Sequence, residues 1–479
     1  MKVTRRRILF HQPPFWRRPS NLYRLFLLAI FSLFGIWLIA NLTKGAIRNP
    51  FEPTPTSTRT AGSYAQEGQT FFNIGNLNAA IASYQQATQV NPNDAEVWTE
   101  LARIQAYSSR LLNDDTQRLA RLTEAMQSAD QAVALAPEDS NVRAIRAFVL
   151  DWNADSSLDV LRTGKPYAND LIFEAEQEAV RAISMDKNNY LALAFYAEIL
   201  VDQQKWTQAE PIIQQALQLG PQIMDIHRVY GQYLESVGNY NQAIEEYQQA
   251  LTINPNLTFL YISIGVNYRK LASGNVPNAQ QIGLYNLALE NFAKAASINT
   301  QLGIKDPLPY LGIAKTYTQQ GEFFAAALNA QKAIAIDPTN ADLYGQLGHV
   351  YKSGRNFETA LIALKCAVRG CTPPESCQAR NGCPTGDNGV AVTGLPLSSS
   401  SAPYYLDYGS VLAAFSPRFP SYCTEAVDVL TQLINAFGNE PDTVSNARDG
   451  LSICASVAAS QAQTPTSIPT PTLLPTPRP

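Results

Sequence analysis

The six cysteines are the residues of this chain whose chemistry depends most on spacing, and all six lie at or after Cys366. Thiols grouped in this way could ligate zinc, form disulfides or act as nucleophiles. Four, five and five residues separate the members of the first group, which are Cys366, Cys371, Cys377 and Cys383. Structural zinc sites instead use closely spaced Cys-x2-Cys pairs. The spacing therefore favours disulfides, which belong to an oxidising compartment.

Other catalytic constellations do not occur in the sequence. The three histidines, His11, His227 and His349, lie far apart, so they indicate neither a metal site nor a catalytic triad. No glycine-rich phosphate loop and no Gly-x-Ser-x-Gly nucleophile motif is found. We therefore expect a protein that is not an enzyme and that uses no cofactor and no metal. Residues 61–460 carry a net charge of about −14, which repels phosphate backbones and argues against a nucleic-acid partner.

A long apolar run near the N-terminus predicts a membrane anchor. Residues 25–42 contain no charged side chain, and at about 1.5 Å per residue they span ~27 Å, close to the ~30 Å thickness of the hydrocarbon layer. Leu22 and Tyr23 extend the run, so the predicted transmembrane helix covers 22–42. A cleaved signal peptide is the alternative, but it usually has a shorter apolar region followed by a small-residue cleavage site, which is not evident here.

The charges around this helix predict its orientation. Seven Lys or Arg precede Leu25, and three follow Leu42 before residue 61. The positive-inside rule then places the basic segment 1–21 in the cytoplasm and the C-terminal body outside it. Two Pro/Thr-rich segments flank the body: a linker at 43–60 and a tail at 461–479, which we expect to be disordered because neither can bury a core.

The body contains one layout at least three times, at residues 62–92, 226–255 and 343–373. A large residue followed by a small one opens the pattern, an Ala-x3-large-x2-Ala stripe follows, and a proline ends it. The cleanest copy consists of Tyr230-Gly231, Leu234, Gly238, Tyr240, Ala243, Tyr247, Ala250 and Pro255. The spacing from Pro221 to Pro255 is 34 residues. This layout resembles the tetratricopeptide repeat (TPR), a helical hairpin of that period.

The resemblance covers residues 61–437 and implies an all-α solenoid of eight to nine hairpins within 61–460, closed by a C-terminal capping helix. A Cys-rich loop at 370–401 fits no repeat. Three repeats exceed the period by 11 to 16 residues, and we place the surplus between their two helices, near 108–116, 153–170 and 271–283. Insertions along one edge could be functional loops or surface loops without a role.

In proteins of this family the first helix of each hairpin lines a concave groove that binds a protein or peptide. The residues that the resemblance places there are Tyr107, Trp152, Asp202, Arg228, Gln232, Arg269, Lys270, Lys315, His349 and Lys352. The fourth and fifth repeats contribute mostly acids, and the sixth to eighth contribute bases. Opposite charges at the two ends suit an extended peptide. The alternative is that these are ordinary solvated charges.

The last two cysteines give the most specific structural prediction. Cys423 begins the second helix of the ninth hairpin, and the turn into the capping helix centres near Asn439. Cys454 follows that turn at almost the same distance as Cys423 precedes it. Antiparallel helices would bring the two sulfurs together, so we predict a Cys423–Cys454 disulfide. The remaining four cysteines would pair among themselves, as Cys366–Cys371 and Cys377–Cys383.

The sequence thus predicts a non-enzymatic, membrane-anchored scaffold with an extracytoplasmic groove for a protein or peptide. One alternative is an assembly factor for envelope polysaccharide or pilus machinery. Another is a carbohydrate-binding or enzymatic module within 370–401.

Overall fold

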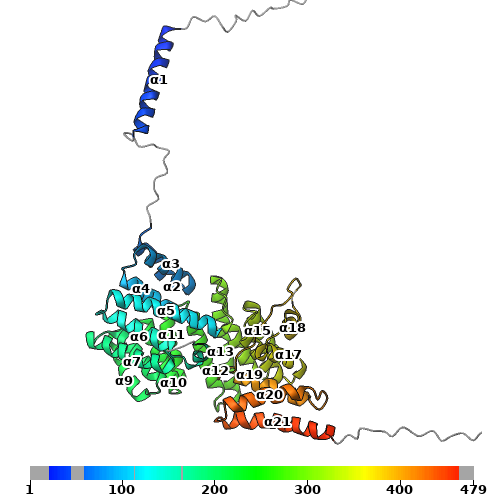
Figure 1. The fold of residues 1–479 in the computed structure, drawn as a ribbon. Coiled ribbons are helices and arrows are strands. Elements are labelled where there is room, and N and C mark those ends of the chain that lie inside the picture. Colours follow the sequence, from blue (N-terminus) through cyan, green and yellow to red (C-terminus); the bar gives the residue numbers. More distant parts are fainter. Residues whose placement is uncertain (1–20, 45–58, 113, 163–165, 384, 463–479) are drawn as a thin grey trace, which may run out of the picture. The chain divides into compact units, whose positions relative to one another are not determined.

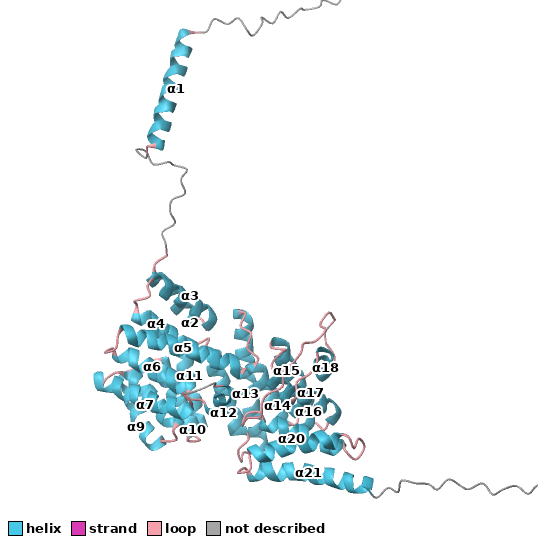
Figure 2. Ribbon diagram, viewed as in Figure 1, coloured by secondary structure: helices cyan, strands magenta, loops and turns pink. Residues whose placement is uncertain are grey.

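The computed structural model describes residues 21–44, 59–112, 114–162, 166–383 and 385–462. The chain forms two compact units, Met1–Arg59 and Thr60–Pro479. Most of the predicted basic segment 1–21, most of the linker 43–60 and most of the tail 461–479 lie outside the described residues. Helices account for the regular structure of the part that is described (Figure 2).

The first unit contains one described helix, α1 (Leu22–Thr43). Its large apolar side chains are exposed along its length, among them Phe26, Phe31 and Trp37. The stretch Leu22–Asn41 is long and apolar enough to cross a membrane. This helix coincides with the predicted anchor, and its length suits the thickness of a hydrocarbon layer.

The second unit is a row of nine antiparallel helical hairpins followed by one more helix (Figure 1). The first five hairpins are α2 (Ala61–Asn73) with α3 (Leu77–Val90), α4 (Ala95–Ser109) with α5 (Asp115–Leu135), α6 (Ser140–Asn153) with α7 (Ala168–Met185), α8 (Tyr190–Asp202) with α9 (Trp206–Leu219), and α10 (Met224–Ser236) with α11 (Tyr240–Ile253). The other four are α12 (Thr258–Ala272) with α13 (Asn278–Leu302), α14 (Leu308–Gln320) with α15 (Phe323–Ile336), α16 (Ala341–Ser353) with α17 (Phe357–Val368), and α19 (Ala402–Phe415) with α20 (Tyr422–Ala436). The row ends with α21 (Pro441–Ala462), and the short α18 (Pro373–Ala379) lies between the last two hairpins.

Local sequence signals set the boundaries of these helices. The side chains of Asp94, Asp139 and Asn189 cap the first helices of three successive hairpins by accepting hydrogen bonds from their first-turn amides. A proline after the second helix ends it, and the next helix then hydrogen-bonds back to that proline. Trp98 Nε1 donates to the Pro92 carbonyl at 2.9 Å. Equivalent bonds run from Arg143 to Pro137, from Tyr261 to Pro255 and from Tyr344 to Pro338.

Small residues allow the two helices of a hairpin to approach closely. A Cβ at Gly231 would lie 2.7 Å from the Tyr247 ring, and one at Gly68 would lie 2.5 Å from the Tyr84 ring. The aromatic ring of the second helix therefore fills the space that the glycine leaves. This is the packing that the repeated large-small pattern predicts.

The insertions differ from the sequence expectation. We placed the surplus residues between the two helices, but part of the surplus instead lengthens the second helix, mainly at its N-terminal end. Helices α5 and α13 have 21 and 25 residues, whereas α11 of the unextended repeat has 14. Only the insertion of the third hairpin adds a separate element, the 3-10 helix η2 (Ser156–Leu161), and α7 is lengthened to 18 residues as well. Asp114, which caps α5, was the signal in the sequence for this earlier helix start.

The hairpins turn far enough for the first to meet the fifth and sixth. Asn254 Nδ2 donates to Asn73 Oδ1 at 3.2 Å, across 181 residues of sequence. At the same seam Gly75 has a φ of +82°, and a Cβ on it would overlap the Asn256 carbonyl oxygen. Only glycine accepts both that conformation and that contact. One continuous core of buried side chains consequently runs from Phe72 to Ile264.

A second core runs from Leu311 to Cys454 and includes the segment 370–401. Ala379 of α18 and Val392 are buried in it, and the amides and carbonyls of Cys371 and Val392 form a single antiparallel bridge. The segment is therefore packed onto the solenoid and has no separate core of its own.

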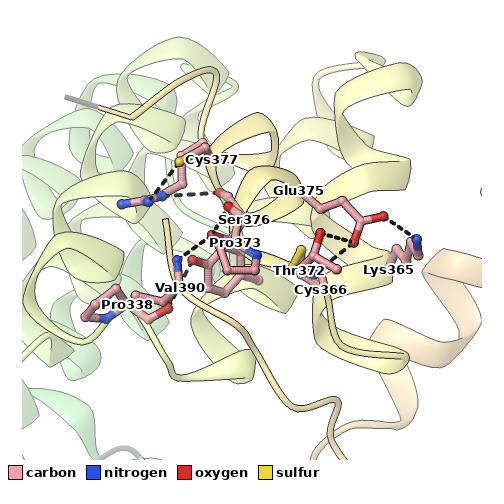
Figure 3. The surroundings of a disulfide bond; sticks show 12 residues. Pro338, Lys365, Cys366, Thr372, Pro373, Glu375, Ser376, Cys377 and Val390 are labelled. Carbon is pink, nitrogen blue, oxygen red and sulfur yellow. Dashed lines mark hydrogen bonds and ion pairs between the residues drawn. A yellow bond between two sulfur atoms is a disulfide. The ribbon is translucent and has the colours of Figure 1, made fainter. Parts of the chain in front are cut away.

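All six cysteines are paired. The bonds are Cys366–Cys371, Cys377–Cys383 and Cys423–Cys454, which are the pairs that the sequence predicts. The first of them lies beside the start of α18, where Glu375 accepts from the Thr372 amide and from Lys365 Nζ, at 2.9 and 2.6 Å (Figure 3). The third joins α20 to α21, and the two Cα atoms are 5.3 Å apart, so the terminal helix is attached covalently to the last hairpin.

Candidate partner-binding groove

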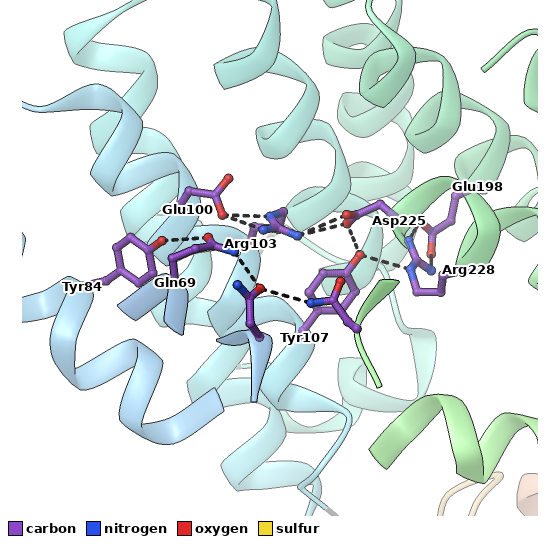
Figure 4. Close-up of polar contacts among 10 residues, drawn as sticks. Gln69, Tyr84, Glu100, Arg103, Tyr107, Glu198, Asp225 and Arg228 are labelled. Atoms are coloured by element: carbon purple, nitrogen blue, oxygen red, sulfur yellow. Dashed lines mark hydrogen bonds and ion pairs between the residues drawn. The ribbon is translucent and has the colours of Figure 1, made fainter. Parts of the chain in front are cut away.

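A buried network of charges joins the first helices of the second, fourth and fifth hairpins (Figure 4). Arg228 of α10 donates to both carboxylate oxygens of Glu198 on α8, at 2.7 and 2.5 Å. The Tyr107 hydroxyl of α4 donates to Asp225, which also accepts from Arg103 at 3.2 Å. Arg228 Nε reaches the same Tyr107 oxygen at 3.2 Å. The network links α4, α8 and α10, and its members are almost fully buried.

Aromatic rings fill the space around this network. The Tyr107 ring stacks on Phe259 of α12 with their centroids 5.4 Å apart, and it packs against Phe148 at 5.2 Å. The Arg228 guanidinium lies 5.4 Å from the Tyr107 centroid and 5.4 Å from that of Trp152. Side chains of the first five to six hairpins thus fill the space around the charge network.

The burial of Tyr107 and Arg228 changes the roles that we expected for them. Tyr107 is 0% exposed, so it offers no surface to a partner, whereas Arg228 is 4% exposed and still lines one of the cavities described below. Burial opposes the charge of Arg228, but the attraction of Glu198 outweighs it and raises the pKa of Arg228 well above its ordinary value. Both residues take part in the buried network that links the hairpins, and a direct role of Arg228 in the groove stays a prediction.

Three cavities remain open along the groove. The first, about 640 Å³, lies between the ends of α4, α6 and α8 and includes Trp152 and Asp202. The second, about 570 Å³, shares Arg110 and Trp152 with the first and continues along α10, α12 and α14. The third, about 340 Å³, follows along α12, α14, α16 and α19. Successive cavities have helices in common, so they form a path along the concave face.

The predicted residues divide among these cavities. Trp152 and Asp202 line the first, Arg228, Gln232 and Lys270 line the second, and the third contains Arg269, Lys315 and His349. Trp152 donates to Glu198 at 2.9 Å, and Gln232 donates to Asp202 at 3.2 Å. Lys352, on α16, lines none of the three.

Several of the predicted bases are already neutralised. Lys270 pairs with Glu235 at 2.7 Å. His349 and Lys352 both contact Asp407 of α19, the first at 2.7 Å. Burial alone would raise the pKa of Asp407, but the bonds from His349 and Lys352 lower it below its usual range. The sequence reasoning did not include Asp407, because only the ninth hairpin folding back beside the eighth brings it there.

Two bases of the third cavity differ from the others. Arg269 and Lys315 have no ion pair with any residue that the structure describes, and Arg269 Nη1 is buried without a hydrogen-bond partner. Burial lowers the pKa of Arg269. The Lys315 side chain is exposed to the groove, but the surrounding protein and the charge of Arg269 lower its pKa despite the attraction of Asp342. These are the uncompensated positive charges of the basic half.

Comparisons with known proteins agree with the repeat architecture. A family described as "TPR repeat" matches residues 68–106. Two families described as "tetratricopeptide repeat" match residues 190–257 and residues 329–362. Comparison with curated proteins gives no match.

Among solved structures, the human IFIT1 dimer with PPP-AAAA is 15% identical, with a TM-score of 0.50, over 84% of this chain and 92% of that one. A thermophilic TPR protein from Thermus thermophilus is 17% identical over 43% of this chain and 98% of that one, with a TM-score of 0.34. At these identities the likeness concerns the fold alone.

Proposed function

Because the chain carries tetratricopeptide repeats, which generally bind protein or peptide partners, we propose that it is a membrane-anchored scaffold that holds an extended partner in its concave groove. The observation that carries this proposal is the row of three cavities along the first helices. Groups that lack a hydrogen-bond or ion-pair partner among the described residues lie at both ends of that row: the Asp151 carboxyl at one end, and Arg269 and Lys315 at the other. A partner segment with charges of both signs would compensate them.

We further propose that the groove lies outside the cytoplasm. The seven Lys or Arg before the apolar helix support an N-terminus in the cytoplasm, and the three disulfides support an oxidising location for the second unit. A protease added to intact spheroplasts should therefore cut the second unit. Complete protection until the membrane is lysed would overturn this orientation.

The partner that we propose is a protein and not a nucleic acid. The body carries a charge of about −14, and the first cavity presents Asp151 and Asp202. A phosphate backbone would be repelled from this end of the groove. The PPP-AAAA of the human IFIT1 structure therefore provides no guide to the ligand of this chain.

Partner capture tests this function. The full-length chain in detergent micelles is used as bait for extracts of its own membrane and envelope, and captured proteins are identified by mass spectrometry. Reversing both unpaired charges, with Arg269→Glu and Lys315→Glu, should lower capture of a specific partner at least tenfold. The matched control reverses Lys294 and Lys305, which are exposed and line none of the three cavities. Equal capture by both double variants would refute the use of the groove.

A further inference from the structure

Asp151, near the end of α6, is a buried acid that the fold does not satisfy. Its side chain is 4% exposed, and neither carboxylate oxygen has a hydrogen-bond partner. Leaving a buried polar group unpaired costs about 1–3 kcal/mol, and more where the group is charged. Glu198 shows the contrast, since it is equally buried but accepts from both Arg228 and Trp152.

The carboxyl lies at the wall of the first cavity, which two of the inserted segments help to build. From the second hairpin come Arg110, at the end of α4, and Arg118, in the extension of α5. From the third come Asp155 and Asn169, which lie before and within the lengthened α7. The unextended repeats have no such segments, so this cavity exists because of the additional residues.

The other charges near Asp151 are mostly paired with one another. Arg118 pairs with Asp155 at 3.0 Å and with Asp115, and Arg228 pairs with Glu198. The guanidinium of Arg110 lies over the Trp152 ring, 4.8 Å from its centroid.

The remaining contributions come from α7 and α8. Asn169 of α7 is uncharged, and Asp202 of α8 is a second carboxylate, which accepts only from Gln232 among the described residues. Two carboxyls are thus left facing one cavity, with Arg110 as the single cation near them that has no acidic partner in the described chain.

We propose that this cavity binds a primary ammonium group, held between the carboxyls of Asp151 and Asp202. An ammonium has three N–H donors and no acceptor, so it can satisfy both buried oxygens of Asp151 and still reach Asp202. Two sources have this chemistry: a lysine side chain of a bound partner, which rests on the function proposed above, and a free alkylamine, which does not.

Protonation of the two carboxyls links binding to pH. Burial, together with the neighbouring Asp202 and Glu198, raises the pKa of Asp151 well above its ordinary value, although Arg228 and Arg110 oppose the shift. Burial and Glu198 raise the pKa of Asp202 to about 7. The empty site therefore holds protons that must leave before both carboxylates can bind a cation. Affinity should rise with pH, by up to about tenfold per pH unit below pH 7 for each proton released.

The experiment measures binding of n-butylamine to the full-length chain in micelles by titration calorimetry at pH 5.5, 6.5 and 7.5. We expect saturable binding that tightens with pH and releases protons to the buffer. Asp151→Asn should weaken it at least tenfold, while Glu290→Gln, an exposed acid of α13 outside the cavities, should leave it unchanged. Binding that is independent of pH, or that survives Asp151→Asn, would overturn the proposal.

Two further arms settle the source and the folding control. A peptide containing one lysine is compared with the same peptide acetylated at Nε: tighter binding of the charged peptide than of butylamine identifies a partner lysine, and the reverse identifies a free amine. If the acetylated peptide binds equally well, the cavity does not select an ammonium. Asp151→Asn should unfold no earlier than the parent chain at pH 7.5, because it removes a carboxyl whose ionisation burial opposes. Capture through Arg269 and Lys315 is measured separately, so either proposal can fail alone.

Discussion

Removing Arg228 should destabilise the first superhelical turn more than most single substitutions in this chain. The variant Arg228→Met leaves Glu198, which is 1% exposed, with the Trp152 indole as its one remaining donor. Breaking a buried ion pair in this way costs about 3–5 kcal/mol, because the second charge stays buried without compensation. The lost contacts of the guanidinium with the Tyr107, Phe148 and Trp152 rings add about 0.5–2 kcal/mol.

A double substitution separates these two contributions. In Arg228→Met with Glu198→Leu the stranded carboxylate is gone, so most of the ion-pair penalty should disappear. Replacement of buried pairs by apolar side chains is often close to neutral. We expect a residual loss of about 1–2 kcal/mol, well below the loss in Arg228→Met alone.

Hydrogen exchange is the appropriate assay, since repeat arrays open locally and a single unfolding midpoint averages over them. For the single variant, a loss of at least about 3.5 kcal/mol corresponds to at least about 300-fold faster exchange, confined to α8, α10 and the helices that they contact. Amides of α16 and α17, which belong to the second core, should keep their protection. Protection within about tenfold of the parent chain, or a double variant as damaged as the single one, would refute the reasoning.

Three further predictions concern other parts of the fold. Replacing Cys423 and Cys454 by Ser opens a loop that spans 31 residues, a loss of about 3.7 kcal/mol in the chain-entropy model, and exchange in α21 should accelerate before that of α20. Gly231→Ala forces a Cβ to 2.7 Å from a tyrosine ring and should cost about 1–3 kcal/mol, whereas Gly62→Ala, which meets nothing within 4 Å, should stabilise its helix slightly in thermal unfolding. Burial raises the pKa of Asp306 to about 7 in the folded chain. The protonated carboxyl therefore stabilises the fold fully below about pH 4, and this stabilisation is lost as the pH rises towards 7. Asp306→Asn should consequently melt later than the parent chain at pH 8 and at the same temperature at pH 4.

Much of the fold could be predicted because each hairpin is encoded locally. Caps such as Asp94 and prolines such as Pro92 set where helices begin and end, and the glycine-aromatic pairs set how they cross. The Cys423–Cys454 bond followed from the same reasoning, since two antiparallel helices joined by a short turn bring equidistant residues together. Information of this kind lies within one or two hairpins and is readable without any knowledge of the rest.

The content of the groove could not be predicted in the same way. Whether Tyr107 faces solvent or packs against Phe259 depends on the summed rotation of several hairpins, to which each adds a small angle. The pairing of His349 and Lys352 with Asp407 likewise crosses from the eighth hairpin to the ninth. The predicted groove residues lie on the first helices of their hairpins, but their burial and their partners follow from the three-dimensional arrangement.

The same concave face contains buried charges that are paired and buried charges that are not, and the two kinds lie in different places. Arg228, Glu198 and Asp225 are buried and paired, and they lie where the solenoid closes on itself. Asp151 is as deeply buried, but it is unpaired and lies where two inserted segments hold a cavity open. A random loss of packing would not coincide with added sequence that builds the walls of the cavity. An unsatisfied buried group in a natural protein calls for an explanation such as a bound ion, a bound water or a functional role, and the proposed ammonium site explains the insertions and the orphaned carboxyl together.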